Sequence, residues 1–303
     1  MSAVRLPGYM RHCTRVLGLS ACLTITSACG GDTTTADGGE TGDEPTLERI
    51  CDGSQDLRLA WFLSFGGGIV RTEFQYEVGF YYLYVRGDCR YWVLPYRDGD
   101  PTWIETHTAV LDEAQETELV ELLHYGDWDD LLGVWPEPGS FDAAIQRVHD
   151  GHSESGIGCV GECPDAPQVV QDIRAAHSSQ LQHWWALGEP STGPMRVLAV
   201  AIPAGENTLP PVPWTVDLHL APLAVDYEQS FCRGMSKLVD DPTTVAALRE
   251  FRAEHADALE DFTDFYVEVE PGVMYELYLR DALPFEDEHG LIPQYNGTTP
   301  DCF

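Results

Sequence analysis

The pattern of apolar and polar positions predicts short strands in the first half of the chain. Apolar and aromatic residues run through 57–63 and 74–78. Two further runs, 80–85 and 89–94, flank Gly87-Asp88, a connection that suits a tight hairpin because glycine accepts positive φ. These runs are each strand-length, which predicts an antiparallel meander.

Three later stretches have helical signals instead. In residues 112–125, Asp112 and Gln115 are spaced as a capping pair, and Gly126 follows the last turn. A second helix is predicted where Asp165 caps a turn containing Pro167, and a third begins at Pro242. The second carries an apolar stripe that ends before Gly188, made of Val170, Ile173, Leu181 and Trp184.

The second half of the chain adds more strands. The apolar run 195–204 and the alternating residues 214–220 both predict strands. Residues 265–269 and 275–279 predict a hairpin around Pro271-Gly272. Strands and helices are mixed without strict alternation, so the fold class expected is α+β: hairpins and a meander with several packed helices, in one large or two small domains.

The first 28 residues are typical of an export signal. Arg5, Arg11 and Arg15 are basic, and no acidic residue precedes Asp32. Residues 16–28 are thirteen mostly apolar or small residues, a stretch too short to span a bilayer. We expect residues 1–28 to be removed.

The end of this stretch, Ser27-Ala28-Cys29-Gly30, resembles the lipobox of bacterial lipoproteins. The resemblance implies that Cys29 becomes the first mature residue, that its sulfur takes a diacylglyceryl group, and that its new amino terminus takes a further acyl chain. Gly30, rather than an aspartate, resembles lipoproteins sent to the outer membrane. The membrane is therefore the expected partner, through the lipid anchor.

Two alternatives to lipidation at Cys29 remain. Thr26 stands where lipoboxes prefer Leu, Val or Ile, and the segment ending at Cys22 fits the pattern better letter by letter. Only about six residues separate Arg15 from Cys22, however, which is short for a signal. Processing at Cys29 also leaves an even six cysteines, whereas processing at Cys22 leaves seven. The other alternative is a plain secreted protein whose Cys29 joins a disulfide.

Charge and composition define the next segments. Residues 29–47 are Gly, Thr, Asp and Glu with almost no apolar side chains, which predicts a disordered acidic tether. The chain carries a formal charge of −33, and removing residues 1–28 leaves 14 basic against 50 acidic residues, or −36. Such a surface repels nucleic acid. Two α+β subdomains are expected to follow, 48–189 and 190–303, separated by the stretch Pro190–Pro194.

The six remaining cysteines are expected to be oxidised, as is usual for an even set outside the cytoplasm. Six cysteines allow fifteen connectivities. The pairing favoured keeps each bridge within one half of the chain: Cys51 with Cys89, Cys159 with Cys163, and Cys232 with Cys302.

A zinc site is the alternative for one of these pairs. If Asp150-Gly151 is a tight hairpin turn, His149 and His152 lie opposite each other on one face. With Cys159 and Cys163 they would supply two nitrogens and two sulfurs, a ligand set that zinc accepts. The disulfide is preferred because the envelope is oxidising.

Chemical motifs favour binding or a structural role over catalysis. The chain lacks a His-Glu-x-x-His helix, a Walker loop and a Gly-x-Ser-x-Gly elbow, so no catalytic residue and no cofactor are assigned. Phe80, Tyr82 and Tyr84 share one face of a predicted strand, and if exposed they would form a platform for a saccharide or a protein. If covered, they are core. The alternative function is a surface-tethered hydrolase without a recognisable motif.

Overall fold

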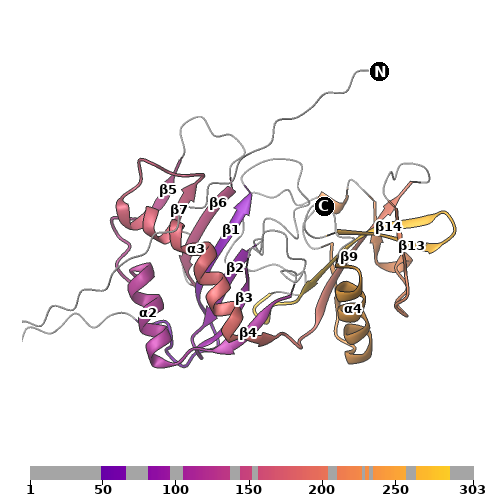
Figure 1. Cartoon of the computed structure of the whole chain (residues 1–303), viewed down its shortest axis with the longest axis horizontal. Coiled ribbons are helices and arrows are strands. Elements are labelled where there is room, and N and C mark those ends of the chain that lie inside the picture. The colour runs from indigo at the N-terminus through magenta and orange to yellow at the C-terminus, as the bar shows by residue number, and fades with distance from the viewer. Residues whose placement is uncertain are drawn as a thin grey trace, which may run out of the picture. The chain divides into compact units, whose positions relative to one another are not determined.

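The computed structural model (Figure 1) describes nine ranges of the chain, and residues 46–303 form one compact unit. The described ranges are 49–65, 81–95, 105–136, 144–151, 156–203, 210–226, 229–231, 235–256 and 264–286. The signal, the lipobox and the tether therefore lie outside the described residues. So do the predicted strand 74–78 and four predicted site residues: Phe80, His152, Cys232 and Cys302.

The first sheet has eight strands in the order β5-β7-β6-β1-β2-β3-β4-β8. Its neighbours pair antiparallel except for β5 and β7. The hairpin at Gly87-Asp88 is confirmed, with Val85 opposite Tyr91. The strands are β1 (Leu57–Phe65), β2 (Tyr81–Arg86), β3 (Arg90–Leu94), β4 (His107–Val110), β5 (Gly133–Trp135), β6 (Ala144–Asp150), β7 (Ile157–Val160) and β8 (Glu189–Pro190).

The second sheet has six strands, in the order β10-β13-β14-β9-β11, with β12 also paired to β9. The hairpin around Gly272 is confirmed, and Gly272 has φ +82. These strands are β9 (Met195–Ile202), β10 (Val212–Pro213), β11 (Ala224–Val225), β12 (Lys237–Val239), β13 (Asp264–Glu270) and β14 (Val273–Asp281). Together with the helices, the two mixed sheets confirm the α+β class.

Three helices lie within the described residues, at the three predicted places: α2 (Glu113–Leu123), α3 (Gln168–Leu187) and α4 (Pro242–Glu254). The Asp112–Gln115 capping box is confirmed, and Asp241 caps α4 through the Thr244 N–H. Asp165 does not cap α3; Pro167 holds that position without a side-chain bond. No helix in the described part of the chain is both long and apolar enough to cross a bilayer.

The helices cover one face of each sheet. α2 and α3 pack on the same face of the first sheet (Figure 1), over a core that includes Trp61, Leu83 and Trp184. α4 packs on the second sheet over Val197 and Leu277. Burial of these apolar side chains is the main stabilising term.

The strand predicted at 214–220 is wrong. The segment between β10 and the short helix Ala221–Leu223 is irregular, because the Leu218 N–H turns back to the Val216 carbonyl and the Trp214 indole N–H reaches the Leu218 carbonyl. Val216 and Leu220 are nevertheless buried. The alternating apolar residues of this segment therefore include side chains that pack in the core, although the segment forms no β-strand.

Two of the three predicted disulfides are confirmed, Cys51–Cys89 and Cys159–Cys163. Cys51–Cys89 joins the segment before β1 to the β2–β3 turn. Cys159–Cys163 closes a five-residue segment that begins within β7 and ends before α3, and both of its sulfurs belong to buried residues. The third pair lies outside the described residues.

His177 is buried in α3, with its ring 5.1 Å from the Trp61 ring and its Nε2 without a hydrogen-bond partner. Burial, with a smaller contribution from Arg174, lowers the pKa of His177 to about 3. An unfolded histidine titrates near pH 6.5. Below that pH the unfolded chain binds a proton that the folded chain does not, so stability falls as the pH is lowered toward 3.

At pH 5 this one residue is expected to reduce the free energy of unfolding by about 2 kcal/mol relative to pH 7. His177→Leu should therefore weaken the acid-induced loss of stability by about that amount, measured by urea unfolding at both pH values. His183→Gln, at an exposed position on the same helix, is the control and should leave the loss unchanged. An equal loss in wild type and His177→Leu would contradict the assignment.

Candidate functional site

The predicted aromatic platform is buried in the described residues. Tyr82 and Tyr84 are 3% and 0% exposed. Leu283 packs with them, and the Phe285 ring lies 5.2 Å from that of Tyr84. Of the two alternatives for these tyrosines, the structure therefore supports the core and not the platform, because a segment about 200 residues away in the sequence covers them. Phe80 lies outside the described residues.

The alternative zinc site is not supported either, because its two cysteines are not free thiols. Cys159 and Cys163 are bonded to each other, so neither sulfur is available as a thiolate ligand. The tight turn it required is absent too: β6 and β7 pair from Val148 opposite Ile157, so the connection is longer than two residues. His149 is buried and stacks on Phe62.

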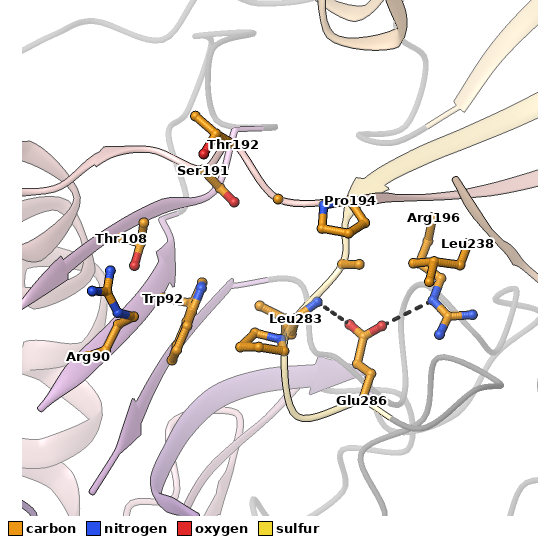
Figure 2. Close-up of a pocket in the computed structure, with 13 residues that line it drawn as sticks. Arg90, Trp92, Thr108, Ser191, Thr192, Pro194, Arg196, Leu238, Leu283 and Glu286 are labelled. Carbon is orange, nitrogen blue, oxygen red and sulfur yellow. Dashed lines mark hydrogen bonds and ion pairs between the residues drawn. The ribbon is translucent and has the colours of Figure 1, made fainter. Parts of the chain in front are cut away.

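The structure has a cleft that no motif pointed to, here called the Trp92 cleft (Figure 2). It encloses about 480 Å³. One wall comes from strands β3 and β4, the opposite side from β9 and β12, and the rest from two connecting segments, 191–194 and 282–286. Its lining residues are Arg90, Trp92, Thr108, Ser191, Thr192, Gly193, Pro194, Arg196, Leu238, Ala282, Leu283, Pro284 and Glu286.

Backbone bonds hold the two connecting segments in place. The Ser191 N–H donates to the Thr106 carbonyl at 2.7 Å, and the Ala282 N–H donates to the Pro194 carbonyl at 2.9 Å. The first bond ties segment 191–194 to the residue before β4, and the second ties it to segment 282–286. The two bonds together fix segment 191–194 against the start of β4 and against segment 282–286.

Glu286 is the carboxylate of the cleft, and both of its oxygens accept hydrogen bonds. Arg196 Nε donates to Oε2 at 3.2 Å, Arg280 donates to Oε1, and the Leu283 N–H donates to Oε1 at 2.9 Å. The side chains of Glu286 and Arg196 are each only 2% exposed. Figure 2 shows Glu286 between Leu283 and Arg196. Glu286 thus accepts from two arginines and from one backbone N–H.

A second buried carboxylate repeats this arrangement behind the cleft. Asp281 accepts from Arg249 at 2.6 Å and from both terminal nitrogens of Arg252 at 3.3 Å. The Thr106 N–H donates to it at 3.2 Å. Arg249 also donates to the Gly193 carbonyl at 2.8 Å, which connects this network to the cleft wall.

Arg90 and Thr108 are lining residues whose side-chain polar groups have no partner in the described part of the chain. The Arg90 side chain is exposed and forms no ion pair or hydrogen bond with the described residues. The Thr108 hydroxyl is buried and has no hydrogen-bond partner. A buried hydroxyl left unsatisfied costs about 1–3 kcal/mol, so this site gains when an oxygen atom approaches it.

The described lining of the cleft holds few groups that could transfer a proton. Its described lining contains no histidine or cysteine, and its carboxylate is held by three donors. Burial raises the pKa of the neighbouring Tyr82 far above neutrality, so that hydroxyl stays protonated and bonds Thr106 at 2.8 Å. No described group in the lining is placed to take a proton from Ser191 or from a water.

The sequence contained one unused signal for this site. Arg196 lies inside the otherwise apolar strand β9 and Arg280 lies near the end of β14, and arginine is rarely buried unless paired. Their spacing on separate strands gives no indication of a shared acid. The pairing with Glu286 and the contribution of Arg90 emerge only in the fold.

Comparison with protein-family models, with curated proteins and with solved structures finds no match for this chain.

Proposed function

We propose that the chain is an acidic lipoprotein of the bacterial cell envelope that binds a small ligand in the Trp92 cleft. Membrane attachment is supported by Ser27-Ala28-Cys29-Gly30 after a short apolar stretch. The acidic segment 29–47 is proposed to hold the body away from the bilayer. The two disulfides are consistent with an oxidising compartment.

The observation that carries the binding role is the composition of the cleft. It combines an aromatic wall, hydroxyls and an exposed guanidinium, while its carboxylate is already occupied. Its volume of about 480 Å³ is within the range of pockets for small molecules, about 300–1,000 Å³. A polypeptide partner would need a wider surface.

Replacing Cys29 by serine should release the protein from the membrane fraction. Each buried methylene of an acyl chain contributes about 0.8 kcal/mol, so several chains hold a protein almost irreversibly and their loss is decisive. Fractionation of expressing cells, followed by immunoblotting, measures the distribution. Cys22→Ser is the matched control and should stay with the membrane. Continued membrane attachment of the Cys29 variant would refute the anchor.

A further inference from the structure

We infer that the Trp92 cleft selects a small carboxylated, polyhydroxylated molecule of the uronic acid class. This inference rests on the proposed binding function and names its ligand. The juxtaposition that carries it is an arginine without an acidic partner, a buried unsatisfied hydroxyl and an indole, brought together on strands β3 and β4.

The charge of the site contrasts with that of the chain. The whole chain has 17 basic against 50 acidic residues. On β3, by contrast, the exposed guanidinium of Arg90 has no acidic partner among the described residues. In a strongly acidic protein, such an unpaired guanidinium favours an anion at this place.

Arg90 is positioned to recognise that anion directly. Its guanidinium is exposed, and a planar fork of donors matches a carboxylate through two parallel hydrogen bonds. It lies two residues before Trp92 on β3, so both side chains are on one face of the strand. In Figure 2 Arg90 lies beside Thr108, where an oxygen of the same ligand would meet the unsatisfied hydroxyl.

The remaining lining fits the rest of a sugar acid. Ser191 and Thr192 add hydroxyls that can donate to and accept from ring hydroxyls. Pro194 is exposed and offers an apolar surface for the C–H face of a ring, whereas Trp92 and Leu283 are 7% and 3% exposed and add only a narrow apolar edge. A bare inorganic anion would use none of this apolar surface, and a neutral sugar would leave Arg90 unpaired.

Isothermal titration calorimetry of the full chain in mild detergent tests the assignment. The probes are galacturonic acid, galactose and sodium sulfate. Galacturonic acid is expected to bind at least 10-fold more tightly than either of the others. Arg90→Gln should lower the affinity for galacturonic acid at least 10-fold and leave the affinity for galactose unchanged. Thr108→Val should lower the affinity for galacturonic acid about 5-fold.

Arg49→Gln is the control for net charge, since it removes an arginine that is paired with Glu116 of α2 instead. It should leave all three affinities unchanged. If galactose and galacturonic acid bind equally well and Thr108→Val abolishes both, the ligand is not an acid, and the inference is overturned. The proposal that the cleft binds a small ligand would still hold. Binding of none of the probes at 10 mM (roughly the weak limit of such sites), or binding insensitive to Arg90→Gln, would overturn the inference. Membrane attachment is judged separately by Cys29→Ser.

Discussion

Replacing Asp281 by asparagine is expected to lower the free energy of unfolding by about 3–5 kcal/mol. The substitution keeps the shape of the side chain and removes its charge, so Arg249 and Arg252 lose their shared counter-ion. Arg252 is only 3% exposed and cannot turn to water without breaking its packing. An uncompensated buried charge, rather than a lost hydrogen bond, sets the size of the effect.

Guanidinium unfolding followed by tryptophan fluorescence measures this loss. Glu162→Gln is the matched control, because Glu162 also pairs with an arginine, Arg174, yet its side chain is 75% exposed. The control should cost less than about 1 kcal/mol, as exposed pairs do. Similar losses in the two variants would show that the buried network is not a distinct source of stability.

Asp281 also illustrates how stability and the cleft depend on the same residues. Its partners come from α4 and from the residue before β4. Arg249, which pairs with Asp281, also donates to the Gly193 carbonyl. Segment 191–194 of the cleft wall is therefore held in place by a carboxylate that does not line the cleft. Substitutions behind the cleft will therefore change binding without contacting the bound molecule.

Elements set by neighbouring residues were predictable from the sequence. The capping box at Asp112 and Gln115, the turn at Gly87-Asp88 and the start of α4 after Asp241 each depend on residues within one turn. Local hydrogen bonds decide such features, so spacing is enough to find them. The two confirmed disulfides were found by assuming that each bridge stays in one half of the chain.

Features set by distant residues were not predictable. The sequence left a platform and a core open for Tyr82 and Tyr84, with core favoured, and the outcome depends on Leu283 and Phe285. The cleft likewise joins Arg90 and Trp92 to residues near 191 and 283. Periodicity describes which face of a strand a residue occupies, but it does not say what covers that face.

Removing the Cys51–Cys89 bridge is expected to cost about 4 kcal/mol at 25 °C, since its 38-residue separation closes a long loop in the unfolded chain. The bridge ties the segment before β1 to the β2–β3 turn, and the Cys51 N–H also bonds Glu116 of α2 at 2.8 Å. The Cys51→Ala/Cys89→Ala variant removes the cross-link and keeps that backbone bond. Its unfolding is compared with wild type in guanidinium without reductant.

The Cys159→Ala/Cys163→Ala variant is the control, because its bridge spans a separation of only 4 and should contribute about 2 kcal/mol through loop closure. Cys89 and Cys163 both have positive φ, so alanine meets similar backbone strain in each variant. The slope of stability against denaturant separates loop closure from lost packing: opening the long loop exposes more surface in the unfolded chain, which raises the slope. A higher slope is expected for Cys51→Ala/Cys89→Ala and an unchanged slope for the control. If the slope rises in neither variant, the bridge stabilises the native packing instead of restricting the unfolded chain.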